Sequence, residues 1–168
     1  AGIAMTVFGR HPERSLHDLA GEALQGALKD AGCSTAELGA AFYAGMTNGP
    51  LQGQISIPGQ VVFSKIGVEG IAVYNVENAC ASGSSAFNLA VQSVRAGTTD
   101  IALALGAEKM NIPDKAKAFS IFEGGWDVSR AEENAATLMK MGEGVVPPPG
   151  SESDKPYSKF MAIYAAMC

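Results

Sequence analysis

Positive charge is scarce in this sequence of 168 residues, in which 17 Asp and Glu outnumber 12 Lys and Arg. Nucleic-acid binders need clustered Lys and Arg to neutralise phosphates, so the acidic balance argues against that class of protein. The three cysteines, Cys33, Cys80 and Cys168, lie too far apart to form a closed disulfide framework. No apolar run approaches the roughly 20 residues that span a bilayer, and the N-terminus lacks the order of a signal peptide. We therefore expect a soluble protein in a reducing, cytoplasmic setting.

Hydrophobic residues make up 47% of the chain, too many for a disordered polypeptide. Ser15 and Asp18 form a capping-box pattern that predicts a helix ending at Gly32. The predicted order is strand, helix, strand, helix, strand, helix, strand, beginning in the apolar opening segment and continuing through 15–32, 40–46, 60–66, 71–76, 82–95 and 101–105. Thr47-Asn48-Gly49-Pro50 is predicted to break the chain after the second strand. Strands that are apolar on both faces and separated by helices indicate an α/β fold with a parallel sheet covered on each side.

The composition changes after Met110, where Lys, Gly and Pro become more frequent. Residues 111–156 are predicted to form an irregular insertion of the kind that covers a site carried by a rigid sheet. We expect its carboxylates to be solvated and its aromatic rings to pack together rather than line a tunnel; these residues are Asp114, Glu123, Asp127, Phe119, Phe122 and Trp126. The end of the chain has helical spacing without a stop signal, at Phe160, Ile163, Tyr164 and Met167, so we expect a piece of a longer protein.

The most informative stretch runs from Asn75 to Ala86, with a strand predicted to end near Glu77 and a helix to begin shortly after Cys80. This spacing places the Cys80 thiol on a sharp turn at a helix N-terminus, a position that favours the thiolate form of cysteine. The neighbouring residues are small, so that a substrate carbonyl can approach. The pattern is the thiol counterpart of a nucleophile elbow, and it predicts an acyl-enzyme nucleophile whose own N–H contributes to an oxyanion hole.

A second interpretation of Cys80 is a buried, unreactive small hydrophobe, and spacing alone leaves both interpretations open. Cys33 and Cys168 are expected to be inert. A cysteine nucleophile usually needs a base, yet the only histidines, His11 and His17, are expected to be solvated and to have no part in catalysis. No Cys or His cluster has metal-ligand spacing. The chain therefore holds a nucleophile without its acid/base apparatus.

Several segments together resemble the N-terminal half of a thiolase. The strongest are Asn78-Ala79-Cys80-Ala81-Ser82-Gly83-Ser84-Ser85-Ala86 and Gly106-Ala107-Glu108-Lys109-Met110. The opening Gly2–Arg10, the Gly59-Gln60 pair and the closing Tyr157–Met161 add to the likeness, which covers nearly the whole chain. The branch that it resembles most includes the thiolase domain of sterol carrier protein x and bacterial lipid-transfer-protein-like thiolases.

The resemblance implies a layered αβαβα fold, of which this chain supplies the first half, residues 1–110, and much of the loop domain, 111–168. It implies that Cys80 attacks the keto carbon of a 3-oxoacyl-CoA and holds the acyl group until a second CoA removes it. Coenzyme A is then a substrate, no cofactor or metal is expected, and the CoA contacts belong in the loop domain. The catalytic His and the second, acid/base Cys would come from a C-terminal half outside this sequence.

The resemblance also implies partners and a place in metabolism. Thiolases pair across a twofold through the strand before the nucleophile, here Tyr74 to Glu77, and some bacterial members of this branch bind a small OB-fold, zinc-ribbon protein. Degradative lipid metabolism such as β-oxidation is expected, in the cytoplasm of a bacterium or in peroxisomes of a eukaryote. The alternatives are a retro-aldolase for CoA-ester side chains, in which Cys80 is not acylated, and a non-catalytic thiolase-like subunit. A ketosynthase-type condensing enzyme ranks lower.

Overall fold

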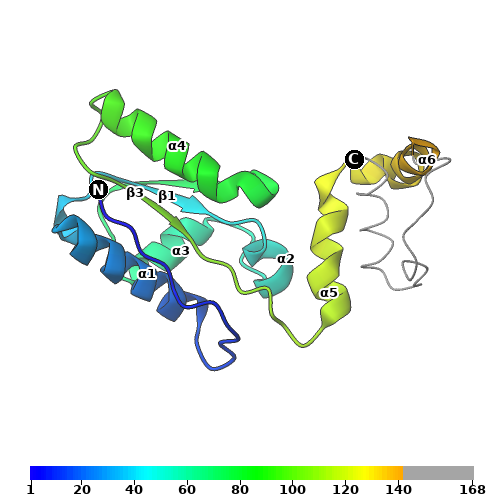
Figure 1. The fold of residues 1–168 in the computed structure, drawn as a ribbon, viewed down its shortest axis with the longest axis horizontal. Helices are drawn as coiled ribbons and strands as arrows, with labels where there is room; N and C mark the ends of the chain where they lie inside the picture. The colour runs from blue at the N-terminus through cyan, green and yellow to red at the C-terminus, as the bar shows by residue number, and fades with distance from the viewer. Residues whose placement is uncertain (142–168) are drawn as a thin grey trace. The chain divides into compact units, whose positions relative to one another are not determined.

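The computed structural model describes residues 1–141, which belong to two compact units. The first unit is Ala1–Pro113, and the second begins at Asp114. The first unit contains a sheet of three parallel strands, and the described part of the second is helical (Figure 1).

The sheet is built around β1 (Ala40–Ala44), with β2 (Ala72–Val76) on one side and β3 (Ala102–Gly106) on the other. Both neighbours run parallel to β1, and Ala44 pairs with Val76 and with Gly106 at the carboxyl ends. All five residues of β1 are buried. This agrees with the uninterrupted apolar run from which the strand was predicted, and it confirms the α/β class.

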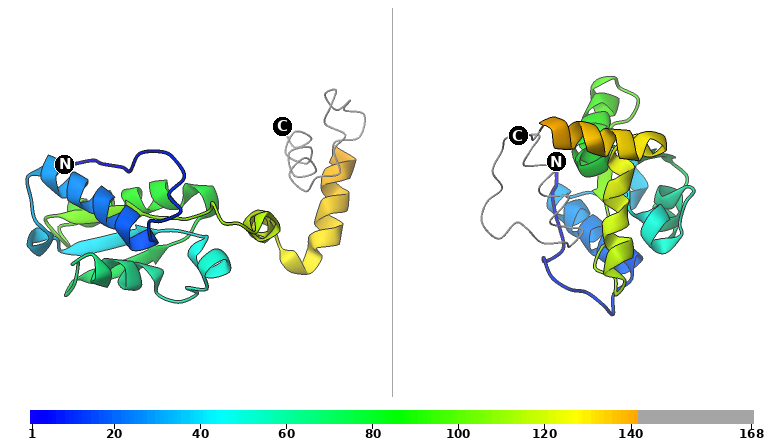
Figure 2. Two further views of the ribbon diagram at one scale, coloured as in Figure 1. Left: turned by 90° about the horizontal axis from the view of Figure 1, so that it is seen from below. Right: turned by 90° about the vertical axis from the view of Figure 1, so that its right-hand side faces the viewer.

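Alternate residues of β1 feed two hydrophobic clusters on opposite faces of the sheet. Ala41 and Tyr43 lie in the cluster with α1 (Leu16–Ala31) and α3 (Pro58–Lys65). The other face packs against α4 (Ser82–Arg95), through Ala40, Phe42, Ala44, Ala86 and Ala90. Figures 1 and 2 show α4 on one side of the strands, with α1 and α3 on the other. The first unit therefore has three layers: helices, sheet, helix.

Local signals set the ends of the longer helices as predicted. The Ser15 hydroxyl accepts the Asp18 N–H at 3.1 Å, and the Asp18 carboxylate accepts the Ser15 N–H at 2.8 Å, which completes the capping box. Gly32 ends α1 with φ of 69°, in the left-handed region that glycine enters without steric cost. The predicted bounds 82–95 for α4 are those observed. The short 3₁₀ turn η1 (Thr35–Glu37) leads into β1.

The prediction of a strand in the opening segment is wrong. Residues 1–9 make no ladder hydrogen bonds and lie along α1, where the Ile3 N–H donates to Asp30 Oδ2 at 2.9 Å. Gly2 approaches α1 so closely that a Cβ there would lie 2.2 Å from the Ala27 carbonyl oxygen. The apolar side chains of this segment remain exposed, namely Ile3, Met5, Val7 and Phe8.

Two further expectations need correction in the first unit. Thr47–Pro50 was predicted to break the chain, but a short helix, α2 (Asn48–Gln52), begins there. Pro50 lies in its first turn, where a backbone N–H has no partner within the helix and its absence costs nothing. β2 is apolar but not buried, and Tyr74 is 52% exposed. Both β2 and β3 are edge strands, but β3 supplies Leu103 and Leu105 to the core cluster, whereas no residue of β2 is a buried member of either cluster.

The described part of the insertion is helical rather than irregular, with α5 (Lys115–Ser120), η3 (Ile121–Gly125), η4 (Val128–Arg130) and α6 (Ala131–Met141). The Asp114 side chain caps α5 through the Lys117 N–H, and the Asp127 side chain accepts the Ser129 N–H at the start of η4. These two carboxylates, expected to be merely solvated, are N-caps. The Phe119 and Phe122 ring centroids lie 6.4 Å apart, so these rings do pack against each other.

The predictions for the end of the chain lie outside the described residues. They concern the remainder of the insertion after residue 141, Cys168, and the helical spacing at Phe160, Ile163, Tyr164 and Met167. Within residues 1–141, no helix is long and apolar enough to cross a membrane.

Candidate active site

The carboxyl ends of the three strands meet at one edge of the sheet, which is where parallel α/β sheets carry their ligand sites. After β2 the chain passes through Glu77 and Asn78 into the 3₁₀ turn η2 (Ala79–Ala81), and α4 follows directly. Cys80 lies in this turn and is exposed. The structure thus places the thiol between a strand and the first turn of a helix, and it removes the interpretation of Cys80 as a buried hydrophobe.

Hydrogen bonds occupy most backbone groups of the Cys80 turn. The Ala79 N–H donates to Glu77 Oε1 at 2.7 Å, and the Ala81 N–H donates to the Asn78 carbonyl at 2.9 Å. Ser82 Oγ accepts the Asn78 N–H and donates to the Ala79 carbonyl. Within residues 1–141, the Cys80 N–H has no hydrogen-bond acceptor. A backbone donor and a thiol of the same exposed residue are therefore both available to an incoming carbonyl.

The loop after β1 is fastened to the loop after β3 by Glu108. Its Oε1 accepts the Met46 N–H at 2.7 Å and the Thr47 N–H at 2.9 Å. A carboxylate that receives two backbone donors forms stronger hydrogen bonds than a neutral acceptor does. Glu108 was singled out in the sequence only as part of a family-like segment, and the structure shows that it joins the two loops.

Tyr43 makes a second connection between the same loops. Its hydroxyl donates to the Ala107 carbonyl at 2.8 Å and accepts the Asn48 side-chain N–H at 2.6 Å. Burial raises the pKa of Tyr43, because the phenolate would be poorly solvated there. Sequence reasoning missed both Tyr43 and Asn48 as polar contacts, since Tyr43 lies in an apolar strand and Asn48 in a predicted break.

The Gly59-Gln60 pair docks the start of α3 against β2. Asn75 Oδ1 accepts the Gly59 N–H at 2.7 Å, and Asn75 Nδ2 donates to Gln60 Oε1 at 2.8 Å. A Cβ on Gly59 would lie 2.6 Å from Tyr43 Cβ, so this position requires glycine for close approach. The pair therefore has a packing role just before the Cys80 turn.

The remaining sequence candidates lie apart from Cys80. Cys33 is half-buried and packs against the cluster of α1 and α3, as expected for an inert thiol. Neither histidine is fully solvated as predicted: His11 Nε2 lies 2.9 Å from the Val7 carbonyl, and His17 Nε2 is buried without a partner in the described chain. Neither forms a hydrogen bond to the Cys80 turn. Among the described residues, no group of three His, Cys, Asp or Glu side chains gathers as a metal site.

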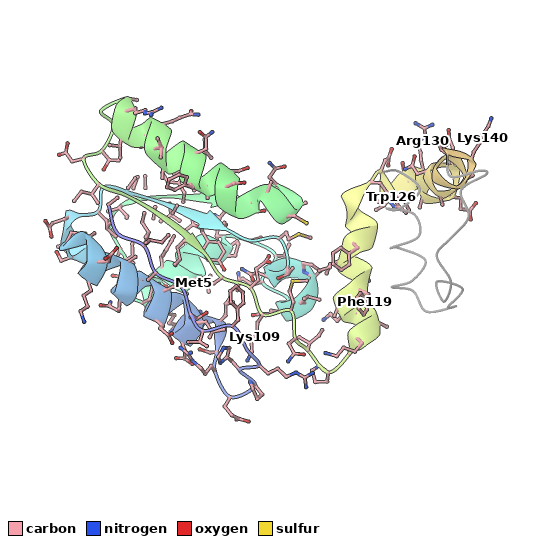
Figure 3. All side chains as sticks on the ribbon, in the orientation of Figure 1. Met5, Lys109, Phe119, Trp126, Arg130 and Lys140 are labelled. Carbon is pink, nitrogen blue, oxygen red and sulfur yellow. The ribbon has the colours of Figure 1, made fainter. Side chains whose placement is uncertain are left out.

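Lys109, labelled in Figure 3, holds the loop that precedes α1. Its Nζ donates to the Pro12 carbonyl at 3.2 Å and to the Arg14 carbonyl. A pocket of about 280 Å³ lies beside it, between the opening segment and residues 108–111, and Cys80 does not line this pocket. Lys109 is thus a tether rather than a group of the Cys80 site.

Most of this chain is similar in sequence to known proteins. The family model described as the thiolase N-terminal domain matches residues 1–144. A sterol carrier protein 2 from Gallus gallus is 36% identical over 121 residues, which cover 71% of this chain and 21% of that protein. An acetyl-CoA acetyltransferase from Methanothermobacter thermautotrophicus is 36% identical over 109 residues, covering 65% and 28%. This chain therefore spans between a fifth and a third of these relatives.

Two more similarities add to these. A benzoylsuccinyl-CoA thiolase subunit from Thauera aromatica is 36% identical over 110 residues, covering 64% of this chain and 27% of the subunit. Among solved structures, a 3-oxoacyl-(acyl carrier protein) synthase III from Xanthomonas oryzae has a TM-score of 0.50 and 19% identity, covering 75% of this chain and 37% of that one. At that identity the second similarity concerns the fold alone.

Proposed function

Because this chain belongs to the thiolase family, as its match to the N-terminal domain model shows, we propose that it carries the nucleophile of an acyl-CoA C-acyltransferase. The observation that supports this most directly is the exposed Cys80 thiol at the turn between β2 and α4, beside its own unbonded N–H. A thiol and a backbone donor on one residue suit the formation of an acyl-enzyme through a tetrahedral intermediate.

The proposed reaction begins when the Cys80 thiolate attacks the keto carbon of a 3-oxoacyl-CoA. The Cys80 N–H stabilises the oxyanion that forms. The bond between that carbon and the adjacent α-carbon then breaks, the electron pair leaves with acetyl-CoA, and an acid protonates the leaving carbon. The acyl group remains on Cys80 until the thiolate of a second CoA takes it and releases the cysteine. Claisen condensation is the same sequence in reverse.

Proton transfer in this scheme requires groups that the Cys80 turn does not hold. Neither histidine reaches the turn, and the nearest carboxylate, Glu77, is engaged by the Ala79 N–H. We assign the acid/base residues to a complementary C-terminal thiolase half, for which the greater length of the relatives leaves room. The coenzyme A substrate would be bound with the help of the second unit and this partner, and no further cofactor is needed.

The outer face of α4 is the surface proposed to receive that half. Phe87, 64% exposed, and Val94, 42% exposed, are seven residues apart and therefore share one side of this helix, next to the face on which Ala86 and Ala90 pack against the sheet, whereas Leu89 lies on a different side. Large apolar side chains exposed together mark an interaction surface. The Cys80 turn leads directly into this helix, so a partner on α4 would lie close to the thiol.

Self-association is proposed through the edge of the sheet, along Tyr74 to Glu77. β2 pairs with β1 on one side only, and an unpaired edge offers backbone groups to a second copy. Tyr74 stacks on Phe42 with ring centroids 4.9 Å apart, which holds its ring in place at the exposed edge. Binding of a small OB-fold partner stays a proposal that rests on the family resemblance.

Turnover by the chain joined to its complementary half tests this function. Replacing Cys80 with Ser should lower kcat for thiolysis by at least about a thousandfold, because a hydroxyl loses its proton far less readily than a thiol and is a far weaker nucleophile than a thiolate. Cys33→Ser is the matched control, since Cys33 packs against the core away from the turn, and its kcat should stay near that of the wild type. Undiminished thiolysis by the Cys80 variant would reject the proposal.

A further inference from the structure

The turn before Cys80 has a backbone conformation that its own residues do not favour. Ala79 has φ of 45°, in the left-handed region where a Cβ is crowded, and Asn78 has φ of −153° and ψ of 49°. A residue other than glycine keeps a left-handed conformation only where surrounding contacts hold it. The contacts that hold Ala79 therefore decide where the next residue, Cys80, presents its thiol.

Ser82 supplies the contacts that span both of these residues. Its Oγ accepts the Asn78 N–H at 2.8 Å and donates to the Ala79 carbonyl at 2.7 Å. One hydroxyl thus bridges the backbone on either side of the strained position, using its single proton and one lone pair. Ser82 is also the first residue of α4, so the bridge fastens the turn to the helix.

Burial distinguishes Ser82 from the other groups around the turn. Its relative exposure is 6%, whereas Cys80 and Gly83 are exposed on either side of it. Three other side-chain hydrogen bonds involve the turn and its flanks, from the Ala79 N–H to Glu77, from the Asn78 side chain to Ser85 Oγ and from Ser84 Oγ to the Ala81 carbonyl, and all three are exposed. Water competes least with the buried hydroxyl, so its hydrogen bonds constrain the turn most strongly.

We propose that Ser82 is a positioning residue for Cys80, whose hydroxyl holds Ala79 in the left-handed conformation and thereby fixes the Cys80 thiol beside its free N–H. The proposal rests on the proposed function of Cys80 and adds the residue that sets the geometry of the nucleophile. Ser82 acts through the backbone and does not contact the substrate.

Alkylation of Cys80 by iodoacetamide in the 168-residue chain tests this without any acyl-CoA. Peptide mass spectrometry would follow Cys80, with Cys33 in the same molecule as the reference. Ser82→Ala should slow alkylation of Cys80 by about tenfold, the factor expected when about 1.4 kcal/mol of conformational preference is lost. Alkylation of Cys33 and the circular dichroism spectrum should not change.

Two matched comparisons separate the hydroxyl from mere packing. Ser84→Ala is the control on the same turn of α4, because Ser84 Oγ is exposed and bonds to the Ala81 carbonyl instead. Ser82→Thr keeps the hydroxyl, and its Cys80 should be alkylated within about threefold of the wild-type rate. Ser82→Val has the shape of threonine without the hydroxyl, and its Cys80 should be alkylated as slowly as in Ser82→Ala. This pair decides the question even where Ser82→Ala is poorly folded.

A second substitution tests the backbone role itself. Glycine adopts positive φ at no steric cost, so Ala79→Gly added to Ser82→Ala should recover at least about threefold of the lost rate. Alkylation of Ser82→Ala at or above the wild-type rate would overturn the proposal, as would an equal loss in Ser84→Ala or no recovery with Ala79→Gly.

Failure of this proposal is distinguishable from failure of the proposed function. In the assembly joined to its second half, Ser82→Ala should lower kcat by about tenfold and leave KM within about twofold, since Ser82 does not bind substrate. If the wild type forms no acyl-Cys80 but the alkylation pattern holds, the function fails and the positioning stands. If Ser82→Ala is acylated as fast as the wild type, the positioning fails and the function stands.

Discussion

The hydroxyl of Tyr43 is a polar group in β1, all five residues of which are buried. It satisfies one carbonyl, that of Ala107, and one side-chain donor, that of Asn48, while the ring packs edge-on against Phe63 with centroids 5.8 Å apart. Thr47 Oγ1 and Asn48 Oδ1, which lie beside this network, are buried and have no partner within the described chain. Removal of the Tyr43 hydroxyl would take this partner from both the Ala107 carbonyl and the Asn48 amide.

Replacing Tyr43 with Phe should lower the free energy of unfolding by about 1 to 3 kcal/mol, because a buried carbonyl and a buried amide then lose their partner. Urea denaturation followed by circular dichroism measures this. Tyr74→Phe is the control, since Tyr74 is exposed on β2, and it should change the unfolding free energy by less than about 0.5 kcal/mol. Equal effects of the two substitutions would contradict the role assigned to the Tyr43 hydroxyl.

Single residues were predictable where the signal is local. Cys80 could be placed on its turn because the end of the strand and the start of the helix both lie within a few residues of it. The contacts of Glu108 with Met46 and Thr47 span 62 and 61 residues, and the contact of Tyr43 with Ala107 spans 64. Such contacts depend on which strands are neighbours, and the sequence does not state that order.

At the scale of elements, the start of α3 is the most tightly packed junction near the site. The Gly59 backbone contacts both Tyr43 in β1 and the Asn75 side chain in β2, so that helix and sheet meet without an intervening side chain. The sequence pattern predicts that the helix begins at residue 60, but it begins at Pro58, because proline at the first helical position has the φ of a helix and needs no N–H partner there.

Introducing a methyl group at this junction should separate the two elements. Gly59→Ala places a Cβ 2.6 Å from Tyr43 Cβ and 2.7 Å from Asn75 Oδ1, and should lower the unfolding free energy by about 1 to 3 kcal/mol. Gly83→Ala in α4 meets no atom within 4 Å and should raise it by about 0.5 to 1 kcal/mol. Thermal denaturation of both variants measures the difference, and a stable Gly59→Ala would show that the junction is looser than described.

The capping box of α1 should make the free energy of unfolding depend on pH. Hydrogen bonds from the Ser15 hydroxyl and N–H lower the pKa of Asp18 below its ordinary value, so the folded chain binds this proton less readily than the unfolded chain does. The stabilisation is present above the unfolded-state pKa and is lost as the pH falls through the folded-state pKa. Asp18→Asn should therefore have a lower Tm than the wild type at neutral pH, and the gap should close below about pH 4. A gap that stays constant down to about pH 2 would contradict this.

Element prediction succeeded where caps and periodicity agree and failed where they conflict. Ser15 and Gly32 bracket an amphipathic run, and α1 forms between them. The opening segment has the composition of a strand, but α1 offers it a surface and β1 already pairs with two other strands. In the insertion, the frequent Gly and Lys residues indicated irregular structure, and the helices that begin after the N-caps Asp114 and Asp127 were therefore not predicted.

At the scale of the whole molecule, the exposed face of α4 carries the expectation of a partner. The family, the α/β class and the parallel sheet follow from the sequence, since motif and hydrophobic pattern agree on them. The surface that would cover Phe87 and Val94 does not, because contacts between surfaces depend on the folded arrangement and leave no local pattern in a sequence.

A charge on this face should weaken the association without unfolding the chain. Phe87→Asp should lower the affinity for a complementary thiolase half by at least about tenfold, because the carboxylate would have to lose its water in the interface. Gln25→Glu adds the same charge at an exposed position of α1, on the opposite side of the sheet, and serves as the control. Sedimentation velocity of the mixtures measures both, and equal affinity of Phe87→Asp and wild type would place the partner elsewhere.

The account depends above all on acyl transfer to Cys80. The most direct measurement is mass spectrometry of the chain with its complementary half after brief exposure to a 3-oxoacyl-CoA, followed by peptide mapping of all three cysteines. The account predicts an acyl adduct on Cys80 that disappears when CoA is added, and no adduct on Cys33 or Cys168. An intact assembly that cleaves the substrate without an adduct on Cys80 would contradict it.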